Sequence, residues 1–457
     1  MGDNMEFNED IFREYDIRGV YPNDINEAFA FLFGKGYGSY IQEKYQLSSV
    51  IVGYDNRFSS VSLTDHLIKG LLSTGVDVIS IGLVTTPMVY YARDLLHNPA
   101  SIMVTASHNP KDDNGFKFSY NDGNAAGNEI YDLRDYIKKG VFLNGKGKII
   151  EKDIIKDFNM LLLNNTNIRG RKLKVVIDCG NGTTSFFVRD IFSRVNIEPI
   201  YLFAKSDPSF PNHHPDPAVE ENMEKLKAVV LNEKADLGVA FDGDGDRCCC
   251  VDNLGRYVKS DQYMAVLFQD IVANNQVKKM VYDVKCSNAL KDQIIKLGGE
   301  AIQYRTGASY AMKKVIKDNL PFGGEYSGHI YFNDRMKTIG CGMYAALRMI
   351  EFLANNDKIL SEEVDKLNVY YSTPEIKYEF SDEKKKEVVE RVKKYCEEKK
   401  YDMITIDGVK ATFDNKKSWV LVRMSNTGPH VTVRFESFSK ERLQELENEF
   451  KVLIENN

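Results

Sequence analysis

Long apolar runs and paired cysteines are both missing from this chain of 457 residues. A membrane-spanning helix needs about 20 consecutive apolar residues, and no segment reaches that length, so we expect no membrane-spanning segment and no membrane partner. The seven cysteines are odd in number and lack paired spacing, which argues against a disulfide framework. Because residues 1–6 are polar and acidic, unlike a secretory signal, we expect a reducing, cytoplasmic location.

An excess of basic charge is also missing. The formal net charge is −6, so bulk electrostatics do not favour nucleic acid as a partner. The Gly-x-x-x-x-Gly-Lys-Ser/Thr loop that binds nucleotide phosphates does not occur, which argues against a nucleotide-dependent kinase. Hydrophobic content of 43% and charged content of 28% are ordinary for a soluble globular protein, and the length allows several domains.

The most informative motif present is Asp-Gly-Asp-Gly-Asp-Arg at residues 242–247. Three carboxylates this close repel one another unless a cation lies among them, and oxygen ligands suit a hard ion such as Mg²⁺ or Ca²⁺. The apolar segment 237–241 predicts a buried strand, so the loop lies at a strand end, where α/β folds bind ligands. An EF-hand is excluded, because Arg247 and Asn253 stand where it needs Gly and Glu. A solvated acidic turn is the remaining alternative.

A strand, an amphipathic stretch and a second strand recur three times along the chain. The first strands are predicted at 50–55, 175–178 and 280–283, and the second strands at 77–81, 198–203 and 300–304. Further along each repeat, an apolar segment runs into a polar loop, at 105–110, 242–247 and 324–329. Repetition over roughly 100–120 residues is too long for a solenoid and indicates related α/β domains with parallel or mixed sheets.

The last segment differs and predicts a smaller α+β domain. Charged amphipathic helices are predicted at 383–398 and 440–455, around one antiparallel hairpin formed by 419–424 and 430–435. The predicted fold class is therefore α/β, with three related domains that have mixed sheets and a C-terminal α+β domain. The boundaries follow from where each pattern restarts, which gives domains at 1–151, 152–255, 256–367 and 368–457.

The loop Thr-Ala-Ser-His-Asn-Pro at 105–110 follows a predicted apolar strand at 101–104. A serine exposed at a strand end, here Ser107, is a candidate nucleophile. It lacks the Gly-x-Ser-x-Gly elbow of the hydrolases, and a plain turn is the alternative for this loop. Lys117 follows closely enough to return to the same loop, where an ammonium group would stabilise charge on a phosphoryl group.

Four loops occur in one order along the chain: 105–110, 242–247, Gly-Glu-Tyr-Ser-Gly-His at 324–329 and Arg-x-Ser-Asn-Thr at 423–427. With Tyr-Asp-Ile-Arg-Gly-Val at 15–20 and Phe-Pro-Asn-His-His-Pro-Asp-Pro at 210–217, they resemble the α-D-phosphohexomutases, in particular the bacterial phosphomannomutase/phosphoglucomutase branch. The resemblance covers essentially the whole chain. It implies four domains in a heart-shaped arrangement around a central cleft, with one loop from each domain.

The resemblance also implies a role for each motif residue. Ser107 would be the phosphoserine and, together with Asp242, Asp244 and Asp246, a ligand of one Mg²⁺ ion per chain. The other catalytic residues implied near the phosphoryl group and the reacting sugar are His108, Lys117, Arg247 and His329. The substrate-binding residues implied are Tyr15, Arg18, Lys285, Glu325, Ser327, Arg423, Ser425, Asn426 and Thr427. Two alternatives stay open. His108 could shape its loop without contacting phosphate, and Lys285 could be a solvated lysine at a strand end.

The function implied is Mg²⁺-dependent interconversion of hexose 1-phosphate and hexose 6-phosphate, with glucose and/or mannose as the sugar. The reaction would pass through phosphoserine and a hexose 1,6-bisphosphate, which would also act as activator. A phosphoglucosamine mutase and a non-catalytic phosphosugar-binding relative are the alternatives. The partners implied are small phosphosugars, and we expect a monomer or a weak homodimer.

Three positions depart from the family pattern. Ala308 stands where a cleft histidine is expected, which leaves the proton-transfer group open, with His329 and Lys285 as candidates. Gly428 replaces a frequent Glu in the phosphate loop, and Tyr326 replaces a more usual Met. The Gly-Glu-x-Ser-Gly-His form of the sugar loop fits hexose phosphates better than acetylglucosamine phosphates.

Overall fold

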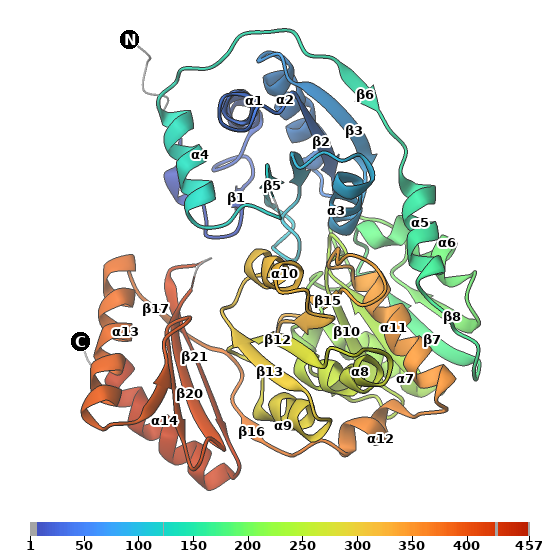
Figure 1. Cartoon of the computed structure of the whole chain (residues 1–457), viewed down its shortest axis with the longest axis vertical. Coiled ribbons are helices and arrows are strands. Elements are labelled where there is room, and N and C mark those ends of the chain that lie inside the picture. Colours follow the sequence, from blue (N-terminus) through green and yellow to red (C-terminus); the bar gives the residue numbers. More distant parts are fainter. Residues whose placement is uncertain (1–6, 122, 426–427, 456–457) are drawn as a thin grey trace.

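The computed structural model describes residues 7–121, 123–425 and 428–455. Figure 1 shows the chain as successive lobes. The first lobe, in blue and teal, lies at the top, and the green and yellow parts of the chain pack together below it. The last part, from residue 376 onward in dark orange and red, forms a separate lobe at the lower left. This is the predicted fold class, with mixed α/β sheets followed by a C-terminal sheet domain.

The first domain is built on a six-stranded sheet in the order β1-β5-β4-β2-β3-β6. Its elements are η1 (Glu9–Ile11), β1 (Ile17–Val20), α1 (Glu27–Tyr45), β2 (Ser49–Tyr54), α2 (Ser60–Leu72), β3 (Asp77–Leu83), α3 (Thr86–Leu95), β4 (Ser101–Val104), β5 (Asp113–Ser119), α4 (Asn128–Lys138) and β6 (Ile149–Glu151). Successive side chains of a strand point to opposite faces. Accordingly Val50 and Val52 of β2 pack in one core with α1 and α2, whereas Ile51 packs in another with α3.

The second and third domains repeat this plan with smaller sheets, in the orders β11-β10-β9-β7-β8 and β13-β12-β14-β15. The second contains α5 (Ile155–Asn164), β7 (Leu173–Asp178), η2 (Thr183–Phe186), α6 (Val188–Phe192), β8 (Ile197–Leu202), η3 (Glu220–Met223), α7 (Glu224–Glu233), β9 (Leu237–Phe241), β10 (Cys248–Asp252) and β11 (Tyr257–Val258). The third contains α8 (Ser260–Asn274), β12 (Lys279–Asp283), α9 (Asn288–Lys296), β13 (Glu300–Tyr304), α10 (Ala308–Lys317), β14 (Phe322–Gly324), β15 (Ile330–Phe332), α11 (Gly342–Asn355) and α12 (Leu360–Asp365).

All three sheets contain the same strand reversal. Strands β4, β9 and β14 each run parallel to a central strand, which is β2, β7 and β12 respectively. Each is followed along the chain by an antiparallel neighbour, which is β5, β10 and β15. The three polar loops predicted from the sequence are the connections within these pairs, so they occupy equivalent places in three related sheets.

The C-terminal domain is an antiparallel sheet covered by two helices. Its elements are β16 (Tyr371–Ser372), β17 (Ile376–Glu379), α13 (Asp382–Glu398), β18 (Asp402–Ile404), β19 (Val409–Phe413), β20 (Ser418–Met424), β21 (His430–Ser437) and α14 (Lys440–Glu455). The predicted hairpin is β20 and β21, and it lies inside a six-stranded sheet rather than alone. Val392 of α13 and Phe450 of α14 share a core with the strands.

One hydrophobic core runs from α3 of the first domain through the second domain into the third. Helix α11 contributes much of it and is buried along most of its length. The C-terminal domain has a core of its own. The seven cysteines are free and buried, and Cys248, Cys249 and Cys250 are the first three residues of the buried strand β10.

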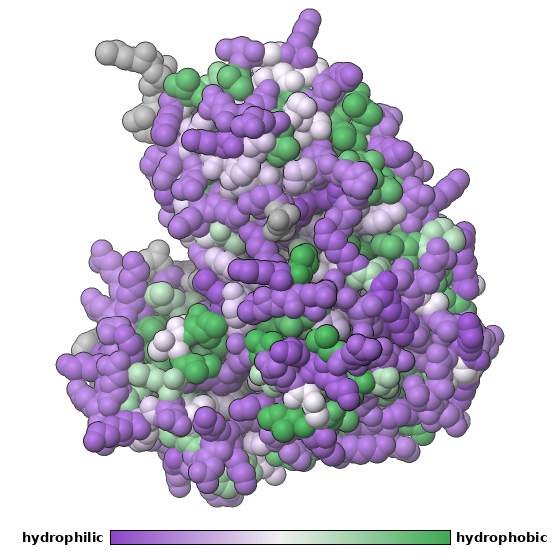
Figure 2. Space-filling view, in the orientation of Figure 1, coloured by the Kyte–Doolittle hydropathy of each residue, from purple (hydrophilic) through white to green (hydrophobic). Residues whose placement is uncertain are grey.

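The face in Figure 2 is mostly hydrophilic, and its outline is notched between the first and the C-terminal lobes. Helix α10 of the third domain contacts the first domain: Tyr310 Oη donates to Glu14 Oε1 at 2.6 Å, and Lys313 Nζ lies 2.6 Å from Glu129 Oε2. Within the described part of the chain, none of the helices has the length and apolar character needed to cross a membrane.

Candidate active site

The loop after β4 and the loop after β9 meet, although they belong to different domains. The Ser107 hydroxyl donates a hydrogen bond to Asp242 Oδ2 at 2.6 Å. The Gly243 backbone lies directly against the Ser107 carbonyl, because a Cβ at position 243 would come within 2.4 Å of that oxygen. Only glycine fits such an approach, which explains the first glycine of the acidic motif.

Ser107 is held in an uncommon backbone conformation. Its φ is +51°, and the left-handed region costs about 1–2 kcal/mol for a residue with a Cβ. Two hydrogen bonds hold it there: its N–H donates to Thr105 Oγ1 at 2.9 Å, and its carbonyl accepts from Arg57 at 2.7 Å. Thr105 in turn donates to Asp55 Oδ2 at 2.7 Å. The surrounding contacts therefore fix the direction of the hydroxyl before any substrate binds.

Arg57 is a supporting residue that the sequence analysis did not identify. The loop at 105–110 that carries Ser107 is called the serine loop below. The buried Arg57 guanidinium donates at 2.5–3.0 Å to four carbonyls in this loop and at the start of β5, those of Ser107, Asn109, Pro110 and Asp113. Its Nε lies 3.4 Å from Asp55 Oδ2. The sequence feature that could have identified Arg57 is the polar turn after β2. Strands β2 and β4 are parallel neighbours, so the turn after β2 and the loop after β4 lie at the same edge of the sheet.

The three aspartates of the acidic loop form one buried group, with carboxylate oxygens within 4.8 Å of one another. Burial and the two neighbouring carboxylates raise the pKa of Asp242 well above its usual range. Among the described residues, Asp244 Oδ1 is buried and finds no partner. Repelling oxygen donors with an unmet acceptor suit a hard divalent cation. Asp242, Asp244 and Asp246 therefore fit the Mg²⁺ that the sequence predicts.

Two basic side chains flank this group. Lys117 Nζ lies 2.8 Å from Asp244 Oδ2 and 2.7 Å from Asp246 Oδ2. Burial opposes its charge, but these carboxylates outweigh burial and raise the pKa of Lys117 well above its usual value. Arg247 Nε lies 3.8 Å from Asp242 Oδ2. Cationic side chains from two domains therefore lie against the acidic group that the Ser107 hydroxyl contacts, and a transferring phosphoryl group needs such cations beside it.

His329 connects the acidic loop to the loop after β14. Its Nε2 lies 3.2 Å from Asp246 Oδ1, and its Nδ1 lies 3.1 Å from both Ser327 Oγ and Glu325 Oε2. Burial lowers the pKa of His329, but the Asp246 charge and the hydrogen bonds outweigh it and raise the pKa to about 9. Glu325, Ser327 and His329 therefore form one edge beside the acidic loop.

Glu325 is also held from the side of α10. The Gly307 N–H donates to Glu325 Oε1 at 2.6 Å, and the Tyr331 hydroxyl donates to Oε2 at 3.0 Å. Gly307 has φ +128° and precedes the first residue of α10, which is Ala308. Position 308, where the sequence analysis expects a histidine, is therefore adjacent to the Gly307 N–H that holds the Glu325 carboxylate.

Of three further predicted residues, His108 and Arg18 lie in or against the serine loop. His108 Nδ1 is 3.3 Å from Ser107 Oγ, and burial together with nearby cations holds the pKa of His108 well below its usual range. Arg18 Nη1 donates to Asn109 Oδ1 at 2.6 Å, in the same loop. Tyr15 lies apart from them and donates from Oη to the Thr306 carbonyl at 2.9 Å.

The predicted phosphate-binding residues lie at the β20–β21 hairpin. Arg423 is 6% exposed, and its Nε donates to Asp407 Oδ2 at 3.0 Å. Ser425 Oγ accepts from the Gly428 N–H at 3.1 Å, so glycine at 428 contributes through its backbone. The predicted residues Asn426 and Thr427 lie outside the described residues. These hydrogen bonds of Arg423 and Ser425 are made within the C-terminal domain.

Lys285 follows β12 and is 7% exposed, so it is not a solvated surface lysine. Its Nζ lies 3.4 Å from Glu375 Oε1. Burial lowers its pKa, but Glu375 and Asp283 outweigh burial and raise it. Tyr326 of the sugar loop lies beside it, and the Arg434 guanidinium stacks on that ring at 3.9 Å from the centroid. The sugar loop is therefore in contact with the C-terminal domain.

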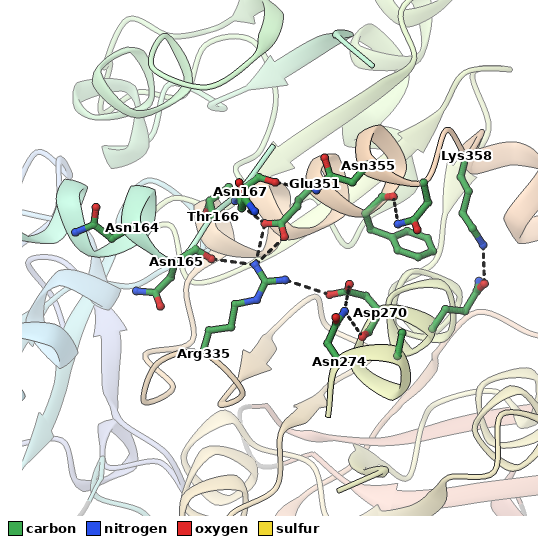
Figure 3. A pocket seen from close by; sticks show the side chains of 14 residues that line it. Asn164, Asn165, Thr166, Asn167, Asp270, Asn274, Arg335, Glu351, Asn355 and Lys358 are labelled. Carbon is green, nitrogen blue, oxygen red and sulfur yellow. Dashed lines mark hydrogen bonds and ion pairs between the residues drawn. The ribbon is translucent and has the colours of Figure 1, made fainter. Parts of the chain in front are cut away.

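A cavity of about 720 Å³ lined by α5, α8 and α11 residues is shown in Figure 3. Its polar side chains already bond one another: Arg335 lies 2.7 Å from Glu351 Oε1 and 3.6 Å from Asp270 Oδ2. The Asn355 amide donates to the Asn167 carbonyl at 2.7 Å. None of the residues predicted for catalysis or binding lines this cavity. The cavity is therefore separate from the predicted active site, and its lining side chains bond one another.

The fold and the meeting of its loops define a multidomain enzyme with a phosphoryl-transfer centre. The chain matches phosphoglucomutase/phosphomannomutase alpha/beta/alpha domain I at residues 9–142, domain II at 152–255, domain III at 259–370 and the C-terminal domain at 375–452. It therefore belongs to the phosphoglucomutase/phosphomannomutase family, as the sequence motifs predicted.

Full-length relatives support this membership. The chain is 37% identical over 440 residues to a phosphomannomutase/phosphoglucomutase of Pseudomonas syringae pv. tomato, covering 96% of this chain and 94% of the relative. It is 34% identical over 452 residues to a phosphoglucomutase of Neisseria gonorrhoeae, covering 98% and 97%. A phosphoglucomutase/phosphomannomutase family protein of Burkholderia thailandensis has a similar crystal structure, with a TM-score of 0.90, 30% identity and 98% coverage of both chains.

Proposed function

We propose that this enzyme is a Mg²⁺-dependent phosphohexomutase that interconverts hexose 1-phosphate and hexose 6-phosphate, with glucose and/or mannose as its sugar. The observation that carries the proposal is the 2.6 Å hydrogen bond from Ser107 to Asp242, which belongs to a buried group of three carboxylates on another domain. A nucleophile beside a hard-cation site and two basic side chains suits phosphoryl transfer, because charge spreads over the phosphoryl oxygens.

In the first half-reaction, Ser107 carries a phosphoryl group and transfers it to the free hydroxyl of a bound hexose monophosphate. The bond between phosphorus and Ser107 Oγ breaks and a bond to the sugar oxygen forms. The sugar hydroxyl loses its proton, and Ser107 Oγ takes one up as it leaves. Lys117 and Arg247 stabilise the phosphoryl oxygens, and His108 and His329 border the transferring group. Mg²⁺, held by Asp242, Asp244, Asp246 and the phosphate on Ser107, would supply Lewis-acid stabilisation at the same place.

The product of this step is a hexose 1,6-bisphosphate. It rotates end over end in the cleft and then returns its other phosphate to Ser107. Arg423 and Ser425, together with Asn426 and Thr427, would hold the phosphate that is not reacting, and this remote grip orients the reacting end. Glu325 and Ser327 would contact the sugar hydroxyls. The remaining residues proposed for the substrate cleft are Tyr15, Arg18 and Lys285.

The bisphosphate would also act as activator, because it restores phosphate to a Ser107 that has lost it. The domains would meet near residues 151, 255 and 367, with a mobile fourth domain hinged close to the last boundary. We propose a cytoplasmic enzyme that works as a monomer or weak homodimer.

A coupled assay tests the function directly. With Mg²⁺ and glucose 1,6-bisphosphate present, kcat/KM is compared for the 1-phosphates of glucose, mannose and glucosamine. We expect glucose and mannose phosphates to be turned over with a clear advantage over glucosamine phosphate. Preference for glucosamine phosphate would instead establish a phosphoglucosamine mutase, and the absence of all turnover would favour a non-catalytic relative.

Ala308→His is expected to change the sugar preference. The new imidazole would stand next to Gly307, whose N–H fixes Glu325 at 2.6 Å. A hydrogen bond to one sugar epimer is worth about 0.5–1.5 kcal/mol, so the ratio of kcat/KM for glucose and mannose phosphates should shift by about 2–10-fold. Measuring both substrates in the variant and the wild type decides this, and identical ratios and rates would show that position 308 has no part in recognition.

Arg57→Lys is expected to reduce phosphate loading of Ser107. A lysine has one nitrogen and cannot bond four carbonyls, and each buried group left unpaired costs about 1–3 kcal/mol. Intact mass after incubation with glucose 1,6-bisphosphate gives the phosphorylated fraction, and thermal unfolding gives the stability. Arg134→Lys is the matched control, because Arg134 pairs with the neighbouring Asp135 at the surface. Equal loading in both variants would contradict the supporting role of Arg57.

A further inference from the structure

Asp407 lies in the turn between β18 and β19, and one of its oxygens joins two domains. Asp407 Oδ2 accepts from Arg423 Nε at 3.0 Å, within the C-terminal domain. The same oxygen accepts from the Thr306 backbone N–H at 3.0 Å, in the third domain. The Asp407 side chain is 9% exposed, so these are buried, charge-assisted contacts.

The backbone around Asp407 is shaped for this contact. Gly408 has φ +74°, and a Cβ there would lie 2.4 Å from the Val422 carbonyl and 2.7 Å from Arg423 Cα. Strand β19 then pairs with β20 from Val409 opposite Val422 onward. The turn is therefore pressed against Arg423, and only glycine permits the approach.

Thr306 continues the connection into the first domain. Its carbonyl accepts from Tyr15 Oη at 2.9 Å. The Tyr15 ring also packs against Gly307, where an added Cβ would come within 2.5 Å of the ring. The loop before α10 thus touches the first domain with its carbonyl and the C-terminal domain with its N–H.

We propose that Asp407 is a positioning residue that aims Arg423 at the idle phosphate and, through Thr306, keeps the C-terminal domain closed over the bisphosphate. Because Nε is bound to Asp407, a phosphate is directed to the two terminal nitrogens of Arg423, which can grip it as a pair. One carboxylate thereby couples the phosphate grip to the closure of the cleft. This inference rests on the proposed mutase function.

Asp407→Ala is the first test, with glucose 1-phosphate as substrate and glucose 1,6-bisphosphate as the released species. A misplaced binding group costs up to about 100-fold, so we expect KM for glucose 1-phosphate to rise about 10–100-fold, with a smaller fall in kcat. We also expect more bisphosphate to escape per turnover, measured from enzyme carrying radiolabelled phosphate. Asp407→Asn keeps an acceptor oxygen and should recover part of both losses.

Three further variants separate this role from general stability. Asp414→Asn is the control, because Asp414 pairs with Arg442 elsewhere in the same domain at 3.1 Å, and it should keep the wild-type KM and bisphosphate escape. Thr306→Pro removes the N–H that Asp407 accepts, together with the threonine side chain and the freedom of φ, so Thr306→Ala is measured beside it. Bisphosphate escape should rise in Thr306→Pro above its level in Thr306→Ala, while KM changes less.

The outcomes are distinguishable from a failure of the proposed function. If the wild type has no mutase turnover, the function itself fails. If the wild type turns over and both Asp407 variants keep its KM and its bisphosphate escape, the positioning role is overturned. If escape rises in the Asp407 variants but not in Thr306→Pro, the closure role is overturned and only the alignment of Arg423 remains.

Discussion

Ser107→Ala is expected to leave a folded protein with almost no mutase turnover. The hydroxyl donates a hydrogen bond to Asp242 Oδ2 at 2.6 Å, and removing a nucleophile lowers kcat by about 10⁴-fold or more. Coupled assays with glucose 1-phosphate give the rate, and intact mass gives the phosphate content. The variant should stay unphosphorylated after incubation with glucose 1,6-bisphosphate, whereas the wild type should gain one phosphate.

The control for this experiment is Ser101→Ala, a change at a buried serine of β4 whose hydroxyl bonds Ser119 Oγ at 2.8 Å. It should keep its turnover, because its hydroxyl does not face the acidic loop. Ser107→Gly adds a second check, since glycine adopts a φ of +51° without strain. Turnover close to the wild type in either Ser107 variant would exclude the serine as the phosphate carrier.

Removing the divalent cation is expected to abolish turnover, and adding Mg²⁺ should restore it. The carboxylates of the acidic loop repel one another when charged, so a bound ion favours the folded state, by about 2.7 kcal/mol at 100 times its Kd. Mg²⁺ should therefore raise the melting temperature of the chelator-treated protein, as measured by scanning calorimetry. Asp244→Asn should weaken this shift, because Asp244 Oδ1 is a buried acceptor with no partner among the described residues.

Asp236→Asn is the matched control for the cation experiment. Asp236 precedes β9 at the other end of the strand and pairs with Arg171, so its Mg²⁺ response should equal that of the wild type. A melting temperature that responds to Mg²⁺ equally in wild type and in Asp244→Asn would place the ion elsewhere.

The strand-end loops were predictable because each combines two local signals. A short apolar run at 237–241 predicts a buried strand, and the glycines and aspartates at 242–247 predict where it stops. The structure has β9 over the same residues. Most of the C-terminal sheet was missed for the opposite reason. Segments 402–404 and 409–413 mix charged and apolar side chains, so their pairing is set by tertiary packing and not by local propensity.

The candidate site could be predicted only where a motif carries it. The residues that support the motifs were missed because their partners are distant in sequence. Thr86 donates to Asp244 Oδ2 at 2.5 Å across a domain boundary, and a lone threonine at a helix start has no signature. Arg57 bonds main-chain carbonyls, which leave no trace in the residue types of the loop. The roles of the predicted site residues stay predictions until the variants are measured.

The shared strand reversal separates the position of each loop from the chemistry that its residues provide. Each of the three loops is anchored at both ends in neighbouring strands, which lie only about 5 Å apart. The sheets therefore set where a loop begins and ends, and the loop residues set what it does. The proposed chemistry at the loop after β4 and the proposed sugar recognition at the loop after β14 therefore lie in separately anchored segments. We therefore expect substitutions in the loop after β14, or beside it at position 308, to change the sugar preference while the loops after β4 and β9 keep their residues.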